Sequence, residues 1–111
     1  LMLPNEWIPA MKKMNITPSF HINHILYYGE ALQLDLLGEA RTQKILPVNS
    51  VATQQIPFSL HGDQPMFEAK PLSLVSTALN RTSESGLLIN EKESIAILQA
   101  LKSVTIDAAW Q

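Results

Sequence analysis

The feature that most constrains the fold of this 111-residue chain is that only two of its segments have the pattern of β-strands. Residues 15–20 are typical of a short strand weakened by Pro18, and residues 56–60 alternate apolar and polar side chains. Helical patterns surround both segments, and this alternation indicates βα units with a parallel sheet. Because a parallel sheet must be covered on both faces, two strands do not complete one. The pattern predicts an α/β chain that is part of a larger fold.

The helices are predicted from apolar spacing, prolines and caps. We expect them over residues 5–14, 34–45 with an interruption at Gly38, 50–54, 71–79, 90–104 and 105–110. Pro71 is well placed in the first turn of its helix. Residues 21–30 mix histidine, asparagine and aromatic side chains without a clean period, so we expect a loop there.

The clearest helical signal lies near the end of the chain. Asn90 with Glu93 three residues later forms an asparagine version of the capping box. An apolar stripe follows, which we expect to be core, made of Ile95, Leu98 and Leu101 and widened by Ile97 and Val104. The earlier helix that begins at Pro71 is expected to bury the face formed by Leu72, Val75, Ala78 and Leu79.

Composition excludes several classes of protein. Eight basic and ten acidic residues give a net charge of −2, so nucleic acid and anionic membranes have no electrostatic footprint to bind. The absence of cysteine excludes disulfides, thiol nucleophiles and cysteine-based metal sites. The longest apolar runs are four residues and no signal-peptide pattern opens the chain, so the default compartment is cytoplasmic. A charged share of 16% is low for a small free-standing domain, which again indicates a piece of something larger.

Histidine and aspartate cluster after the two predicted strands. His21 and His24 follow the first strand, and His61 and Asp63 follow the second. The carboxyl ends of parallel strands are where such folds bind ligands, and these residue types hold zinc or iron. The first two histidines face one site only if the residues between them turn helically. The alternative stays open that they are hydrogen-bonded surface residues and that Asp63 belongs to an ordinary turn.

Residues 18–30, PSFHINHILYYGE, resemble the segment after the sixth barrel strand in the amidohydrolase superfamily. They are most similar to the branch that contains N-substituted formamide deformylase, in which the pattern P-S-F-x-x-x-H-x-x-Y-W-G-D is usual. Tyr28 stands here for the tryptophan and Glu30 for the aspartate.

Four further segments resemble motifs of the same family in the same order. They are residues 37–41, LGEAR, for L-G-x-x-R, with Pro47 after it; residues 58–65, FSLHGDQP, for the eighth-strand motif S-L-H-S-D-x-P; Pro71-Leu72 with residues 80–82 for D-P-L and T-R, with Lys70 in place of the aspartate; and residues 99–109 for E-A-L-x-x-x-T-I-x-A-A. The resemblance covers nearly the whole chain.

The resemblance implies a partial TIM-like (β/α) barrel of the metal-dependent hydrolase type. Residues 1–111 would be the C-terminal part of that barrel domain, with no second domain visible. A complete barrel takes about 250 residues, so the family's His-x-His, bridging ligand and fifth-strand histidine are expected upstream of Leu1. The implied reaction is hydrolysis of a C–N bond in a small-molecule amide or formamide. Its water would be activated by a divalent metal, with zinc as the first choice.

The resemblance also implies roles for single residues. His24 would be the sixth-strand metal ligand, with His21 in reserve. Asp63 would bind the metal and act as the catalytic general base, and it would then give the proton to the leaving nitrogen. His61 would orient Asp63 or touch the substrate. Tyr28 would line the substrate pocket or support the residues that do, while packing in the rim is the more common role of such a tyrosine.

Two other interpretations stay open on the sequence. The chain could be a truncated, inactive relic of such an enzyme, or a non-enzymatic module whose apolar surface serves oligomerisation. We expect the fragment alone to be inactive, because upstream ligands are missing from it. Exposed strand edges and apolar helix faces also predict self-association. A parent gene without an upstream His-x-His would remove the enzyme interpretation.

Overall fold

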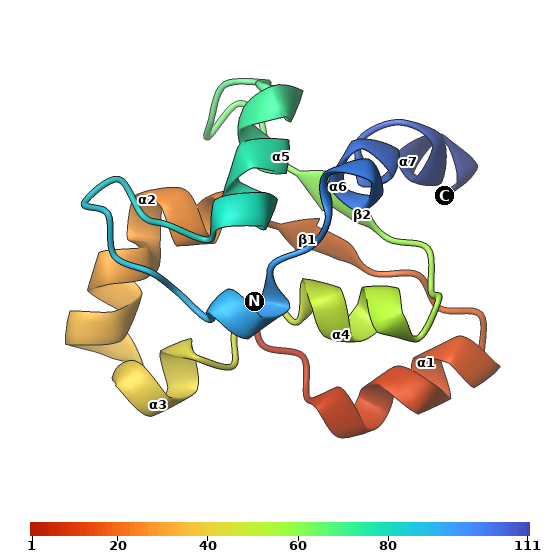
Figure 1. Ribbon diagram of the computed structural model, residues 1–111, viewed down its shortest axis with the longest axis horizontal. Coiled ribbons are helices and arrows are strands. Elements are labelled where there is room, and N and C mark those ends of the chain that lie inside the picture. Colours follow the sequence, from red (N-terminus) through yellow and green to blue (C-terminus); the bar gives the residue numbers. More distant parts are fainter.

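The computed structural model describes residues 1–111, and two parallel strands lie side by side across its middle (Figure 1). Strand β1 (Ser19–His21) pairs with β2 (Ser59–His61) so that residue 19 stands opposite 59 and residue 21 opposite 61. The predicted parallel pairing is confirmed, and the chain is a small α/β domain of two parallel strands with helices around them.

Both strands are shorter than expected, and each begins and ends later in the sequence than the predicted ranges 15–20 and 56–60. Residues 15–18 stay outside β1, since Asn15 has a left-handed backbone with φ 54° and Pro18 has no N–H to donate. Likewise, β2 begins only at Ser59. As a result, each strand ends on a histidine, His21 in β1 and His61 in β2.

Seven α-helices surround the strands: α1 (Ile8–Lys13), α2 (Asn23–Ala31), α3 (Glu39–Thr42), α4 (Val48–Thr53), α5 (Pro71–Asn80), α6 (Ile97–Ser103) and α7 (Ile106–Trp110). Residues Asn5–Trp7 and Glu91–Glu93 form 3-10 turns, and Leu32–Leu36 form a π-helical turn. In Figure 1, α5 lies above the strands and α4 and α1 lie below, while α5, α6 and α7 all contact β2. None of these helices has the length and apolar character that crossing a bilayer requires.

The predicted loop over residues 21–30 is wrong, because α2 occupies most of it. Four buried positions follow a helical period there: Ile22, Ile25, Gly29 and Leu32. The period is hidden in the sequence because one of its positions is a glycine. A Cβ added at Gly29 would lie 3.1 Å from Cγ1 of Ile89, so the missing side chain permits close packing.

The predicted helix over residues 34–45 is also interrupted more than expected. The π-helical turn Leu32–Leu36 ends before Gly38, which has φ 75°, and only the four residues of α3 continue as helix. Ile45 is buried beyond the end of this helix, whereas Ala40 is exposed. The predicted helices that begin near residue 5, after Pro47 and at Pro71 are confirmed.

The capping box predicted at residues 90–93 does not form. Asn90 has a left-handed backbone with φ 51°, and its amide donates to the carbonyl of Ile45 at 3.1 Å. The carboxylate of Glu93 accepts hydrogen bonds from the backbone N–H and the hydroxyl of Ser50, at 2.8 and 2.5 Å. Both side chains therefore serve tertiary contacts, and α6 begins only at Ile97.

The apolar stripe predicted as core is only partly buried. Ile95 is buried, Leu101 and Val104 are half-buried, and Ile97 and Leu98 are exposed. Helix α6 begins late, and its buried face is formed by Ala100 and Ser103 instead. In α5, Leu74, Val75 and Ala78 are buried, while Leu72 is exposed, contrary to the predicted face.

A buried arginine ties the loops around the core together. Arg81 follows α5 in a left-handed conformation, and its side chain is fully buried. The guanidinium donates to four backbone carbonyls, those of Ile45 (3.0 Å), Leu46 (3.2 Å), Ile89 (2.9 Å) and Glu93 (3.4 Å). Burial lowers the pKa of Arg81 to about 10, so the group is still charged at neutral pH.

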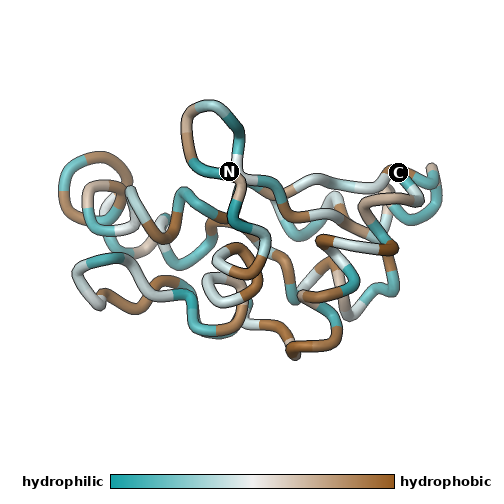
Figure 2. Tube along the Cα trace, turned by 90° about the horizontal axis from the view of Figure 1, so that it is seen from above, coloured by the Kyte–Doolittle hydropathy of each residue, from teal (hydrophilic) through white to brown (hydrophobic).

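Many large apolar side chains are exposed on this chain. Figure 2 shows hydrophobic stretches on outer bends of the trace as well as in its interior. On the C-terminal helices and the π-helical turn these residues are Ile97, Leu98, Ile106, Trp110, Leu34 and Leu36. Those of α6 and α7 lie on two helices that contact each other, and large exposed apolar patches mark contact sites in soluble proteins.

Candidate functional site

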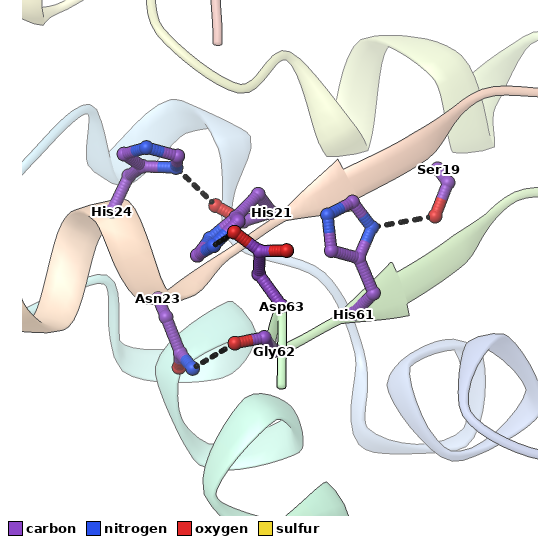
Figure 3. A network of polar contacts seen from close by, with 7 residues as sticks. All are labelled: Ser19, His21, Asn23, His24, His61, Gly62 and Asp63. Carbon is purple, nitrogen blue, oxygen red and sulfur yellow. Dashed lines mark hydrogen bonds and ion pairs between the residues drawn. The ribbon is translucent and has the colours of Figure 1, made fainter. Parts of the chain in front are cut away.

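One face of the two-stranded sheet carries only polar side chains. Side chains alternate between the faces of a strand, so Ser19 and His21 share one face of β1, and Ser59 and His61 share one face of β2. The parallel register places these four residues beside one another, and Figure 3 shows three of them, Ser19, His21 and His61. Phe20 and Leu60 point the other way and are buried in the core. The chemistry of the chain is therefore gathered on the face opposite its core.

His21 lies at the centre of this cluster and lacks hydrogen bonds. Its side chain is 11% exposed, and neither ring nitrogen has a hydrogen-bond partner. Nε2 lies 3.6 Å from a carboxylate oxygen of Asp63. The ring centroid lies 4.1 Å from that of His24 and 5.0 Å from that of His61. Buried polar atoms are rarely left unpaired, so this imidazole marks a place for a further group.

Burial keeps His21 neutral. Desolvation is the largest effect that lowers its pKa, and His24 and then His61 lower it further. A contact with its own backbone opposes them, and the carboxylate of Asp63 does so to a smaller extent. A neutral imidazole has one nitrogen with a free lone pair, which is the form that binds metals.

The ring of His24 is oriented by its neighbour in the chain. Ile22 already has helical dihedral angles, so residues 21–24 turn helically, which is the condition for a shared site. Nδ1 of His24 lies 3.1 Å from the carbonyl oxygen of His21. A carbonyl only accepts, so Nδ1 must carry the proton and Nε2 keeps its lone pair. His24 is thereby prepared to act as a ligand through Nε2.

Asp63 follows β2 in a turn held against α2. Its φ is 57°, a left-handed conformation that aspartate tolerates better than most residues. The buried amide of Asn23 donates to the carbonyl of Gly62 at 3.5 Å, and a Cβ at Gly62 would lie 3.3 Å from that amide nitrogen. The turn therefore packs closely on the start of α2, with the carboxylate 58% exposed beside His21.

His61 makes its hydrogen bond away from Asp63. Its Nδ1 lies 2.7 Å from the hydroxyl of Ser19, which itself accepts a hydrogen bond from the hydroxyl of Ser59 at 2.9 Å. The histidine within ion-pair distance of Asp63 is His21. The sequence patterns did not single out either serine, although both strands carry the sequence Ser-apolar-His, and this repeat is the signal that could have found them.

Aromatic rings border the cluster on the side of α2. Tyr27 stacks on Phe67 with centroids 4.6 Å apart, and Phe67 meets His21 edge to face at 5.5 Å. The ring centroid of Tyr28 lies 5.9 Å from the ring centroids of both Phe67 and His24. Sequence patterns gave no indication of Phe67. Beside the cluster is a cavity of about 210 Å³, whose walls include His61, Gln64, Phe67 and Lys70.

The largest cavity of the chain lies elsewhere. It measures about 430 Å³ and runs between the N-terminal segment and the turn at Asn90. Neither a histidine nor Asp63 lines it. The histidine cluster is the better candidate site, because its residues have unpaired ring nitrogens and a carboxylate at short range.

The donors of the cluster fit a divalent metal in their chemistry. Neutral His21, the free Nε2 of His24 and the carboxylate of Asp63 are the ligand types that zinc takes. No group of three or more histidine, cysteine, aspartate or glutamate side chains stands close enough together to hold a metal alone. These side chains therefore do not form a complete metal site as they stand.

Comparisons with known proteins give one match. A family model described as "Amidohydrolase family" matches residues 1–111. No curated protein and no solved structure matches the chain.

Proposed function

Because the chain belongs to the amidohydrolase family, we propose that it forms part of a metal-dependent hydrolase of C–N bonds. The observation that carries this proposal is the environment of His21. Its side chain is only 11% exposed, its ring nitrogens have no hydrogen-bond partner, and Nε2 lies 3.6 Å from the carboxylate of Asp63. An unpaired polar group in a packed site costs stability, so its retention favours a functional role.

We propose that residues 1–111 are the C-terminal part of a TIM-like barrel. Two adjacent parallel strands, each followed by a helical segment, support this architecture, and both strands have an unpaired outer edge. In such barrels the active site lies at the carboxyl ends of the strands, where His21 and His61 end β1 and β2. Further strands of the same barrel would supply the remaining ligands.

His24, His21 and Asp63 are the proposed ligands of a divalent metal, with zinc as the first choice. A bound metal of this kind polarises a carbonyl group and lowers the pKa of water to about 7. Asp63 accepts a proton from the attacking water while the water oxygen bonds to the carbonyl carbon. It then returns that proton to the nitrogen as the C–N bond breaks, so that an acid and an amine leave.

The proposed substrate is a small-molecule amide, and a formamide fits best. This choice rests on the resemblance of residues 18–30 to the branch of N-substituted formamide deformylase. Tyr28 and Phe67 stand beside the histidines and would flank an apolar substituent on the nitrogen. His61 would contact the substrate rather than the metal, since its Nδ1 already faces Ser19.

Metal titration tests the proposed ligands. In the complete barrel protein, His24→Gln is expected to lower the affinity for Zn²⁺ or Co²⁺ by at least ~10²-fold, because losing a ligand costs more than losing a supporting hydrogen bond. Calorimetry and the visible absorption of Co²⁺ would measure it. His61→Gln is the matched control and should change affinity less than about threefold. Unchanged metal affinity in both His24→Gln and His21→Gln would reject this ligand set.

We also propose that the 111-residue chain self-associates when it stands alone. Its support is the set of exposed apolar side chains on α6 and α7 together with the unpaired strand edges. Sedimentation at micromolar concentration should detect oligomers. Leu98→Gln should weaken association about tenfold, as removing one buried leucine would. Lys102→Gln on the same helix should leave it unchanged, and a compact wild-type monomer would contradict the proposal.

A further inference from the structure

We propose that Ser59 and Ser19 fix His61 as a hydrogen-bond donor to the substrate, in the tautomer opposite to that of His24. This inference deepens the proposed function and rests on it for the identity of the acceptor. It assigns a positioning role to two serines and divides the histidines of the cluster between two tasks.

The order of the hydrogen bonds carries the assignment. Ser59 is buried, and its hydroxyl donates to the oxygen of Ser19 at 2.9 Å. The proton of Ser19 is then free to point along the 2.7 Å contact to Nδ1 of His61. The hydroxyl of Ser19 would then accept one hydrogen bond and donate the next, an arrangement that strengthens both. Nδ1 of His61 is therefore an acceptor, and the proton of the neutral ring lies on Nε2.

His24 provides the contrast within the same cluster. Its Nδ1 faces a carbonyl oxygen, which only accepts, so its proton lies on Nδ1 and its free lone pair on Nε2. The backbone partner of His24 and the hydroxyl partner of His61 thus favour opposite tautomers of the two rings. His24 presents a lone pair suited to a metal, whereas His61 presents an N–H suited to an anionic or carbonyl oxygen.

The position of His61 suits this task. In Figure 3 the edge of its ring opposite Ser19 faces His21 and Asp63. The ring centroids of His61 and His21 are 5.0 Å apart and the two rings are nearly perpendicular, so they are not stacked on each other. An amide carbonyl oxygen gains negative charge when water adds to its carbon. A fixed N–H donor at that point stabilises the developing charge.

The test is direct detection of the tautomers in protein labelled with ¹⁵N only at histidine. The chain has three histidines, so the two-bond ¹H–¹⁵N spectrum of the neutral rings stays simple. We expect His24 as the Nδ1–H form and His61 as the Nε2–H form. Ser19→Ala should convert His61 into a mixture of both forms and leave His24 unchanged, which also reports that the fold survives. Ser19→Thr keeps the hydroxyl and should restore the wild-type spectrum.

Kinetics of the complete enzyme give a second readout. Ser19→Ala should lower kcat about tenfold with little change in KM, since a donor that strengthens toward the transition state acts on kcat. Ser19→Thr should be close to wild type. Two results would overturn the inference, whether or not Zn²⁺ binds. One is an Nδ1–H form of His61 in the wild-type protein, and the other is a His61 spectrum that Ser19→Ala does not change. If the tautomers are as expected but Zn²⁺ added to the complete barrel protein shifts neither His24 nor His21, the proposed function fails and the tautomer assignment stands.

Discussion

Replacing Asp63 with asparagine is expected to lower turnover of the complete enzyme by at least ~10²-fold while the fold is kept. Asparagine has the same shape as aspartate and tolerates the left-handed backbone that Asp63 adopts, with φ 57°. It cannot accept the proton of the attacking water, however, so the reaction loses its general base. The measurement is steady-state release of amine from an amide or formamide.

The control makes the same chemical change elsewhere. Asp35→Asn alters an exposed carboxylate on the π-helical turn Leu32–Leu36 that forms no ion pair, and it should leave turnover within about twofold. The circular dichroism of the Asp63→Asn protein must match the wild type. Because Asp63 is also a proposed metal ligand, both proteins must be assayed with enough added Zn²⁺ to load them. Near-normal turnover of the Asp63→Asn protein with its metal still bound would contradict Asp63 as the general base.

Replacing Arg81 with methionine is expected to lower the free energy of unfolding by about 3–5 kcal/mol, because several buried carbonyls lose their donor at about 1–3 kcal/mol each. Methionine fills similar volume but leaves four backbone carbonyls without the donor that satisfies them. Arg81→Lys keeps the charge and should lose about half as much, because an ammonium group cannot reach as many carbonyls as the guanidinium fork.

Urea denaturation would measure these changes. All variants must be compared at one protein concentration, because self-association adds to apparent stability. Arg41→Met is the matched control, since Arg41 is exposed and donates one hydrogen bond, from Nε to the carbonyl of Leu37 at 2.7 Å. Its cost should stay within about 0.5 kcal/mol. An equal effect of both substitutions would mean that the buried network of Arg81 carries no special stability.

Structure that depends on near neighbours in the chain was predictable. The α/β alternation, the parallel pairing and the helix that begins at Pro71 rest on apolar periods and on the geometry of proline. The placement of His21 and His61 at the carboxyl ends of strands follows from the same patterns. His21 and His24 share a site only if the chain turns helically between them, and the start of α2 provides this turn.

Predictions failed where distant residues compete with local signals. Gly29 belongs to the buried face of α2 only because Ile89 packs against the space a side chain would fill. Asn90 and Glu93 have the spacing of a capping box, but Ile45 and Ser50, more than 40 residues away in sequence, take their hydrogen bonds. A hydrogen bond to a buried partner outweighs an exposed cap, so the local motif does not form.

The sequence by itself determined which residue types follow each strand, and therefore that histidine and aspartate meet at one edge of the sheet. Only the tertiary structure decided how these residues divide the chemistry. The register of β1 on β2 sets Ser19 beside His61 and His21 beside Asp63. Register depends on pairs 40 residues apart, and a shift of one residue would turn every side chain of a strand to the other face. For this reason the neighbours of His21 and His61 follow from the fold and cannot be read from the order of residues.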